Sequence, residues 1–285
     1  MKIYITGISG MLSDDIIKAF DNDVNKIYGC DIKKSKYSQI DITDYDKLEA
    51  DILKVKPDVI IHTACLIDTE RCQEDQDYAY NININGTKNI VEIVKSNKLK
   101  CKIVYISTHA VYEGIVGNYK ENEVNDNQAN YYSRTKYLSE KEIEKYSNHL
   151  ILRVNIFGFG KIDKSNNYAE YVMDNLISGK EFNAYEDIYF NPLYTGVFAK
   201  CLPFILDKTG IYNIGARNSM SKFDFALKLA EMFGYNQSLV KKSQSSFKVN
   251  RPKNITANCE KIGLSLPTIE SNIIEFKDDW LKHRR

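Results

Sequence analysis

Short apolar runs alternate with amphipathic stretches through the first half of the chain. The apolar runs lie at residues 3–6, 26–31, 58–62, 102–107 and 149–153, and residues 11–20, 45–55, 76–96 and 131–146 between them repeat apolar positions at helical spacing. Strands separated by helices of this length are typical of βαβ units in a parallel sheet. Because such crossovers are right-handed, the pattern predicts an α/β fold with a Rossmann-type doubly wound parallel sheet.

The rhythm changes after residue 153. Residues 158–167 are rich in Gly, Asn and Ser and predict a loop, and a helical pattern follows at 168–178. A further apolar run at 211–214 is expected to rejoin the sheet. Helices are then predicted at 222–233 and at the C-terminal end, where the last one ends near Lys282.

These shifts divide the chain into two parts. We expect a dinucleotide-binding Rossmann domain made of residues 1–157 and 188–214, and a smaller discontinuous C-terminal substrate-binding lobe made of residues 158–187 and 215–285. Open parallel sheets bind ligands at the carboxyl ends of their strands, so the lobe is expected to pack there.

Composition and charge exclude several classes of protein. The 285 residues include 39 Lys and Arg against 38 Asp and Glu, and the net charge of +1 argues against a protein that binds nucleic acid by bulk electrostatics. No stretch approaches the roughly 20 apolar residues of a membrane span, and the N-terminus lacks the pattern of a signal peptide. The sequence therefore predicts a cytoplasmic protein with no nucleic-acid or membrane partner.

The six cysteines, Cys30, Cys65, Cys72, Cys101, Cys201 and Cys259, form no C-x-x-C pair. Several lie inside apolar runs, which indicates small core residues in a reducing cytoplasm. No dense cluster of carboxylates and histidines identifies a metal site, so none is expected.

A glycine-rich turn directly follows the first apolar run. Gly7 permits a tight turn, and Gly10 lets the backbone approach a pyrophosphate at the amide-rich start of the next helix. The spacing is G-x-x-G-x-x-S, because Ser13 stands in the place of a third glycine. The residues expected to hold the pyrophosphate are Gly7, Ser9, Gly10, Met11 and Leu12.

Asp31 ends the second predicted strand, 21 positions after Gly10. A carboxylate there can accept hydrogen bonds from an adenosine ribose. Together with the glycine turn, it indicates a dinucleotide cofactor, either NAD(H) or NADP(H). Asp31 favours NAD because it repels a 2′-phosphate, whereas Lys33 and Lys34 offset that repulsion, so both cofactors stay open.

A second set of residues carries proton-transfer chemistry. Ser107 and Thr108 end the fourth predicted strand, and Tyr132 follows 24 residues after Thr108. Tyr132 and Lys136 are spaced i and i+4, which places them on one face of a helix. An ammonium beside a phenol lowers the phenol's pKa, so Tyr132 can exchange a proton with an oxygen at the carbonyl or alcohol level. Tyr131 lies five positions before Lys136, so its side chain is expected to point away from Lys136.

The chain resembles an extended short-chain dehydrogenase/reductase in the order of four features: the glycine turn, Asp31, Ser107-Thr108 and the Tyr132-x-x-x-Lys136 pair. Three further segments support the resemblance: Asp41-Ile42-Thr43-Asp44, His62-Thr63-Ala64 and Asn83-Ile84-Asn85-Gly86-Thr87-Lys88-Asn89. The chain is most similar to the dTDP-4-dehydrorhamnose reductase branch, through residues 106–108, 111–114, 132–140, 251–254 and 261–267.

The resemblance implies NAD(P)H-dependent reduction of the 4-keto group of a nucleotide-linked 4-keto-6-deoxy sugar, for surface polysaccharide biosynthesis. Tyr132 would protonate the nascent alkoxide, Thr108 would orient it, and Lys136 would hold the cofactor ribose and tune Tyr132. The cofactor contacts implied by the family motifs also include Asp41, Ile42, Thr63, Ala64, Asn83 and Ser107. The substrate contacts expected are His109, Asn155 and Arg251, and Lys222 and Lys253 are candidates for the diphosphate from their charge.

Three positions depart from the branch. His109 replaces a usual Asp, Ser133 replaces a usual Gly beside Tyr132, and Ser13 replaces the third Gly of the turn. These departures bear on the identity of the sugar more than on the chemistry.

Other functions remain open at this point. A nucleotide-sugar 4-epimerase would use the same tyrosine and lysine with tightly bound NAD, and a 3,5-epimerase-reductase would need a further acid/base pair such as Cys and His. A noncatalytic nucleotide-binding regulatory subunit could use the same fold. The expected partner is a nucleotide-sugar substrate, and a homodimer is left open along with the nucleotide base and the sugar.

Overall fold

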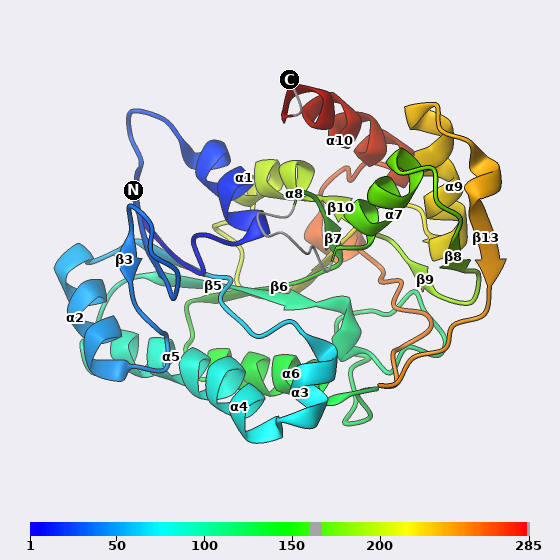
Figure 1. Cartoon of the computed structure of the whole chain (residues 1–285). Helices are drawn as coiled ribbons and strands as arrows, with labels where there is room; N and C mark the ends of the chain where they lie inside the picture. The colour runs from blue at the N-terminus through cyan, green and yellow to red at the C-terminus, as the bar shows by residue number, and fades with distance from the viewer. Residues whose placement is uncertain (160–166, 284–285) are drawn as a thin grey trace.

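Seven parallel strands form the central sheet of the computed structural model, which describes residues 1–159 and 167–283 (Figure 1). Their order across the sheet is β11-β6-β5-β4-β1-β2-β3, and every neighbouring pair is parallel. The strands are β1 (Lys2–Thr6), β2 (Lys26–Asp31), β3 (Ser38–Gln39), β4 (Val59–His62), β5 (Lys102–Thr108), β6 (His149–Val154) and β11 (Gly210–Ile214). The fold class predicted from the sequence is confirmed, and the apolar run at 211–214 does rejoin the sheet.

Helices cover both faces of the sheet (Figure 1). The helices of the described residues are α1 (Met11–Phe20), α2 (Tyr45–Val55), α3 (Thr69–Glu74), α4 (Gln76–Tyr80), α5 (Gly86–Ser96), α6 (Tyr131–Ile143), α7 (Tyr168–Ile177), α8 (Thr195–Cys201), α9 (Lys222–Phe233) and α10 (Ile269–His283). None of the helices in this part of the chain is long and apolar enough to cross a membrane.

The strands bury both of their faces because successive side chains point to opposite sides. In β1, Ile5 packs with α1 in one hydrophobic cluster, whereas Tyr4 packs with α2 and α5 in the other. In β5, Val104 and Tyr105 divide in the same way. This explains why the strands read as continuous apolar runs and not as alternating ones.

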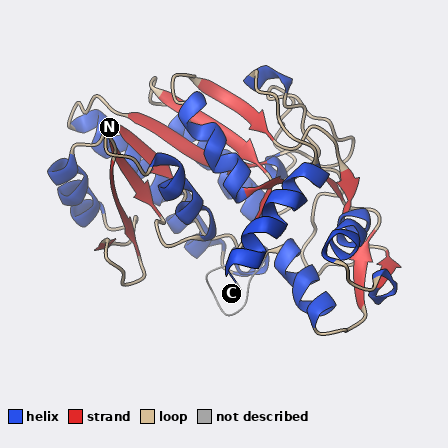
Figure 2. Cartoon of the chain, turned by 90° about the horizontal axis from the view of Figure 1, so that it is seen from above, coloured by secondary structure: helices blue, strands red, loops and turns tan. Residues whose placement is uncertain are grey.

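Among the described residues of the second half, the chain adds three two-stranded sheets and further helices (Figure 2). The pairs are β7 (Ile156–Phe157) with β10 (Leu193–Tyr194), β9 (Tyr189–Phe190) with β12 (Met220–Ser221), and β8 (Phe182–Tyr185) with β13 (Val240–Ser243). Phe157 meets Phe225 of α9 and Phe276 of α10 edge to face, at centroid distances of 5.2 and 5.5 Å. These aromatic side chains belong to the same hydrophobic cluster as Ile5 and α1, on one face of the central sheet.

Two predicted helices differ from the observed ones. Residues 76–96 do not form one α-helix, because a π-helical turn at Asn81–Asn85 separates α4 from α5. The Asn83 carbonyl there accepts hydrogen bonds from the side chains of Thr87 and Ser139, which stabilises the widened turn. The helix predicted at 131–146 ends at Ile143, where the backbone tightens into i to i+3 bonds. Of the loop predicted at 158–167, residues 160–166 lie outside the described residues.

A buried ion pair joins α6 to the sheet. Arg153 of β6 and Glu140 of α6 approach to 2.7 Å, and both side chains are almost fully buried, at 2% and 0% exposure. The same carboxylate accepts a hydrogen bond of 2.5 Å from Ser107 of β5. Ser107 and Arg153 are register partners in neighbouring strands, so one carboxylate fixes the helix to both strands.

The network continues from Arg153 to the edge of the sheet. The guanidinium donates to the Tyr112 hydroxyl at 3.1 Å and to the Glu121 carbonyl at 2.7 Å. Tyr112 in turn donates to the side chain of Asn213 in β11, at 2.6 Å. Both charges of the buried pair, Arg153 and Glu140, therefore have hydrogen-bonded partners, and these partners make the burial of an ion pair tolerable.

Removing one member should destabilise the fold strongly. Glu140→Ala leaves Arg153 buried without its counter-charge and is expected to cost about 3–5 kcal/mol of unfolding free energy, measured by urea denaturation. Lys141→Ala, which breaks an exposed pair with Glu144 on the same helix, should cost about 1 kcal/mol or less. Equal losses in the two variants would show that the buried pair is not what holds α6.

Candidate functional site

The glycine turn closes tightly against β2 and the loop after β4. Gly7 has a φ of +71°, and its amide donates to the Cys30 carbonyl at 2.8 Å. A Cβ at Gly7 would lie 2.9 Å from the backbone of Ala64 and from Thr63 Oγ1. Gly10 is the N-cap of α1 and offers no side chain to cap it. The first amides of α1 are thereby left for an external acceptor.

Ser13 replaces the third glycine without opening the turn. Its side chain is fully buried, and its hydroxyl donates to the Gly7 carbonyl at 2.9 Å. The serine therefore ties α1 back to the turn, and the departure from the glycine pattern keeps the local geometry compact.

Asp31 is joined to the glycine turn by its own carboxylate. It accepts the Ser9 amide at 3.0 Å through one oxygen and the Lys33 amide at 2.9 Å through the other. Two carboxylate oxygens offer about four acceptor sites, so lone pairs remain for further donors. Of the other residues expected on this side, Asp41 is exposed and accepts from Thr43, while Ile42 is buried and its carbonyl accepts from Asn89.

The loop after β4 is held by hydrogen bonds to β1 and to Asn83. Thr63 Oγ1 donates to the Thr6 carbonyl at 2.7 Å. Asn83 accepts the Leu66 amide at 2.7 Å and donates to Thr135 of α6 at 2.8 Å. Asn83 thus connects this loop to the helix that carries Tyr132.

His62 is a packed residue beneath this site. It is fully buried, and its two ring nitrogens contact the hydroxyls of Thr6 and Thr87 at 2.7 and 2.9 Å. Burial lowers the pKa of His62 to about 3, and the charge of Lys136 acts in the same direction. The ring is therefore neutral and bridges β1 to α5.

Tyr132 and Lys136 lie one turn apart on α6, as the spacing predicts. Lys136 is 2% exposed, its Nζ donates to the Ile106 carbonyl at 2.8 Å, and it lies 4.2 Å from the centroid of the Tyr105 ring. Tyr132 is half-buried, and its hydroxyl has no hydrogen-bond partner within residues 1–159 and 167–283. Its phenol is therefore free to bond a ligand.

The net pKa shift of Tyr132 is opposite to the one expected from Lys136 alone. Burial raises the pKa of the phenol and the neighbouring Cys65 raises it further, while Lys136 opposes them. A raised pKa keeps the proton on Tyr132, which suits an acid more than a base in the unliganded protein.

The end of β5 places Thr108 and hides His109. The Thr108 hydroxyl accepts the Ala110 amide at 3.1 Å and so keeps its own proton for another acceptor. His109 is fully buried, and burial lowers its pKa to about 3. The His109 ring lies against Gly215 and does not line the cavity described next, so the structure does not bring it to a substrate. Thr108 and Lys136 do not line the cavity themselves but lie beside the lining residues Ala110 and Tyr132 in the strand end and helix.

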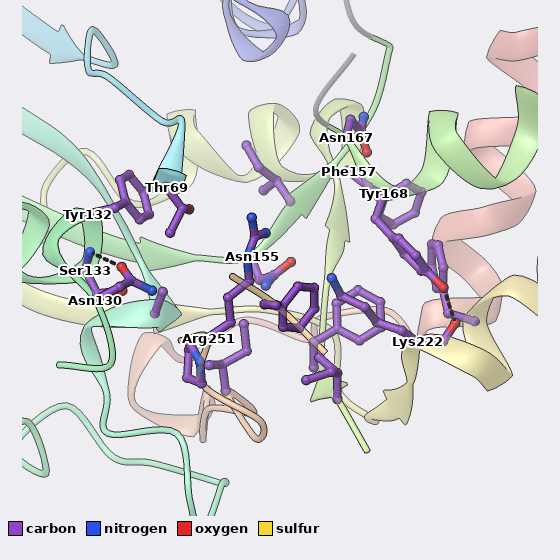
Figure 3. A pocket seen from close by; sticks show the side chains of 18 of the residues that line it. Thr69, Asn130, Tyr132, Ser133, Asn155, Phe157, Asn167, Tyr168, Lys222 and Arg251 are labelled. Carbon is purple, nitrogen blue, oxygen red and sulfur yellow. Dashed lines mark hydrogen bonds between the residues drawn. The ribbon is translucent and has the colours of Figure 1, made fainter. Parts of the chain in front are cut away.

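A cavity of about 240 Å³ opens beside Tyr132, between the carboxyl ends of the central strands and the helices α7 and α9 (Figure 3). Its lining is Thr69, Ala110, Asn130, Tyr132, Ser133, Asn155, Ile156, Phe157, Asn167, Tyr168, Ala169, Ile188, Phe190, Lys222, Phe225, Phe247, Arg251, Pro252 and Ile255. Tyr132 and Lys222 lie on opposite sides, with Asn155 between them (Figure 3). Of the predicted substrate residues, the structure brings Asn155 and Arg251 to this cavity.

Two cations line the cavity. Arg251 pairs with Glu70 at 2.6 Å, and both side chains are partly exposed, at 34% and 41%.

Lys222 begins α9, lies 4.7 Å from the Tyr168 ring centroid and forms no ion pair with a described residue. Burial lowers the pKa of Lys222 to about 8, and Arg251 adds to the shift. Lys253 pairs with Asp187 at 2.8 Å and does not line the cavity.

Asn130 and Ser133 are two of the lining residues that were not predicted as site residues. Asn130 caps α6 through the Ser133 amide, and an Asn directly before a helical pattern was a usable signal for it. In the sequence, Ser133 stands out only because it replaces a usual Gly beside Tyr132. Within the described ranges, no group of three or more His, Cys, Asp or Glu side chains is arranged to hold a metal ion.

The family model described as RmlD substrate binding domain matches residues 1–276. The chain belongs to this family. The match covers the glycine turn, the Tyr132–Lys136 pair and both cavity cations, so the residues of the site all fall inside the family's shared region.

Relatives of two functional kinds are similar to this chain. Methionine adenosyltransferase 2 subunit beta of Danio rerio is 24% identical over 285 residues, covering 95% of this chain and 86% of that protein. A dTDP-4-dehydrorhamnose reductase of Aggregatibacter actinomycetemcomitans is 25% identical over 239 residues, covering 80% and 78%. The solved dTDP-4-dehydrorhamnose reductase of Bacillus anthracis in complex with NADP has a TM-score of 0.86 at 22% identity and covers 98% of each chain.

The glycine turn gives a direct test of the close contact at Gly7. Gly7→Ala should destabilise the protein by about 1 kcal/mol for the positive φ and by about 1–3 kcal/mol more for overlap with Ala64. Gly179→Ala is the matched control, because Gly179 has a φ of +63° and no atom within 4 Å of an added Cβ. Urea unfolding measures both, and equal losses would disprove the close contact.

Proposed function

We propose that this chain reduces the 4-keto group of a nucleotide-linked 4-keto-6-deoxy sugar with NADH or NADPH. One observation carries the proposal: Tyr132, whose hydroxyl has no hydrogen-bond partner among the described residues, lines a cavity that also holds the cations Arg251 and Lys222, with Lys222 on the opposite side (Figure 3). A proton donor at one end and positive charge at the other match a sugar carbonyl attached to a diphosphate.

The residues at the glycine turn fit a dinucleotide. The turn has no room for side chains at Gly7, the start of α1 has amides without a cap, and Asp31 retains free lone pairs. The turn and the start of α1 would hold the pyrophosphate, Asp31 the adenosine ribose, and Lys136 the nicotinamide ribose. When bound, the nicotinamide supplies hydride. The Bacillus anthracis reductase holds NADP, while Asp31 favours NAD, so the proposal covers both.

The side chains of α6 and β5 supply the proton chemistry. Tyr132 gives its proton to the oxygen of the sugar carbonyl as that oxygen gains charge, and its raised pKa keeps the proton available. Thr108 would donate a hydrogen bond from its hydroxyl to the same oxygen, while one of its two lone pairs accepts the Ala110 amide. Lys136, held by the Ile106 carbonyl, offsets the charge that Tyr132 acquires.

Lys222 and Arg251 would bind the diphosphate. Arg251 is already paired with Glu70, but an exposed pair contributes only about 0–1 kcal/mol, so a phosphate can replace it at little cost. Lys222 forms no ion pair with a described residue, so a phosphate would not have to displace a carboxylate from it. The reduced sugar would serve surface polysaccharide synthesis, in keeping with the reductase relatives.

A noncatalytic nucleotide-binding subunit is the second candidate. The likeness to methionine adenosyltransferase 2 subunit beta favours it. Thr108, Tyr132 and Lys136 favour an enzyme, because a purely binding role needs no proton donor at the cavity wall. A 4-epimerase would use the same residues without net oxidation of added NADH or NADPH.

Tyr132→Phe tests the proposal most simply. The change keeps the ring and removes the hydroxyl, so turnover should fall by about 10²–10⁴-fold while cofactor affinity changes little. The measurement is the steady-state oxidation of NADH or NADPH by a panel of dTDP-, UDP-, GDP- and CDP-linked 4-keto-6-deoxy sugars.

Tyr131→Phe is the matched control on the neighbouring position. Its offset to Lys136 is five residues, so its turnover should stay close to that of the unchanged protein. Near-normal turnover of Tyr132→Phe on an accepted sugar would refute the proton-transfer role. Wild-type protein that binds the cofactor but oxidises it with no sugar of the panel would favour the binding subunit.

Lys222 predicts a pH dependence of substrate binding. Its lowered pKa of about 8 means that the ammonium is present below that pH and lost above it. Affinity for nucleoside diphosphates should therefore fall by about 10-fold as pH rises through this value, as measured by calorimetry. Lys222→Met should bind weakly throughout and lose that dependence. An unchanged pH profile in Lys222→Met would mean that another group titrates.

A further inference from the structure

Ser133 carries a buried polar atom that the protein leaves without a hydrogen-bond partner. The residue is fully buried, its Oγ has no partner, and it lines the cavity directly beside Tyr132. Its amide is satisfied by Asn130 Oδ1 at 2.9 Å, so only the hydroxyl is unpaired.

The other buried hydroxyls of α6 are all paired. Thr135 Oγ1 donates to the Tyr132 carbonyl at 2.8 Å, and Ser139 Oγ donates to the carbonyls of Asn83 and Thr135 at 2.7 and 2.8 Å. A buried hydroxyl without a partner loses its bonds to water and gains nothing in return. The helix accepts this loss at the one buried hydroxyl that faces the cavity.

A second unpaired atom lines the same cavity. Arg251 Nε is buried and has no partner, although the guanidinium's other end bonds Glu70. Among the described side chains that line the cavity, these two atoms are the buried polar atoms that lack a partner. A ligand with polar groups at both ends would satisfy both.

The position of Ser133 selects which part of the ligand it meets. Ser133 and Tyr132 line the same cavity, so a sugar whose carbonyl meets Tyr132 presents its neighbouring ring substituents to the lining that includes Ser133. In a 4-keto-6-deoxy pyranose, the two ring carbons beside C4 are C3, which bears a hydroxyl, and C5, which bears a methyl group. The C3 hydroxyl is thus the polar group closest to the carbonyl.

We infer that Ser133 is a specificity-determining residue that hydrogen-bonds the sugar's C3 hydroxyl. The inference rests on the proposed function and adds to it the feature of the sugar that this chain reads. A glycine at this position, usual in the branch that the sequence resembles, cannot make this bond.

Calorimetry on the intact chain with bound NADPH tests the inference. The probes are dTDP-rhamnose and its 3-deoxy counterpart, each also as the UDP, GDP and CDP form. Ser133→Ala should bind the 3-hydroxy sugar about 10-fold more weakly and the 3-deoxy sugar unchanged. Ser139→Ala is the control on the same helix and should keep the wild-type ratio between the two sugars.

Thermal unfolding of the unliganded variants gives a second readout. Because the Ser133 hydroxyl has no partner, Ser133→Ala should not lower the midpoint, whereas Ser139→Ala should lower it. A midpoint lowered as much in Ser133→Ala as in Ser139→Ala would show a structural partner and overturn the inference. So would an unchanged preference for the 3-hydroxy sugar.

The two proposals fail in different ways. Wild-type protein that binds a nucleotide sugar while Ser133→Ala keeps its preference overturns the role of Ser133 alone. Wild-type protein that binds none of the nucleotide sugars overturns the proposed function, and the role of Ser133 with it.

Discussion

The Glu140 carboxylate is the point at which α6 and the central sheet are joined. It bonds Ser107 of β5 and Arg153 of β6 at once, from a helix that also carries Tyr132 and Lys136. Thr108 follows Ser107 directly. The separation between the proton donor on α6 and the hydroxyl on β5 is therefore set by a buried contact and not by surface packing, and such a pair has few alternative geometries.

The two charged sides of the cavity are anchored by different kinds of ion pair. The α6 side is fixed by the buried network, whereas Arg251 approaches from a segment held to α3 by exposed ion pairs, Arg251 with Glu70 and Lys248 with Glu74. Exposed pairs are weak and easily exchanged. Under the proposed function, a phosphate could exchange with the carboxylate of the Arg251–Glu70 pair while the buried contacts of α6 stay in place.

The sequence predicted the parts that depend on local pattern. Apolar runs identified the sheet, and i, i+4 spacing placed Tyr132 and Lys136 on one helical face. What depends on distant packing was not predictable: His109 is buried against Gly215, which lies more than 100 positions away, and the Tyr132 pKa is raised by burial that no spacing reveals. Arg153 could have pointed to the buried ion pair from the sequence, because an arginine in an apolar strand requires a buried partner of opposite charge.

Transfer of deuterium tests the central claim most directly. The intact protein would be incubated with NADH or NADPH carrying deuterium at the transferred position and with the dTDP-linked 4-keto-6-deoxy sugar, and the sugar analysed by mass spectrometry and NMR. A reductase places one deuterium at C4 for each cofactor oxidised. Cofactor binding without oxidation, or a recovered sugar without label at C4, would contradict the account and favour a nucleotide-binding subunit.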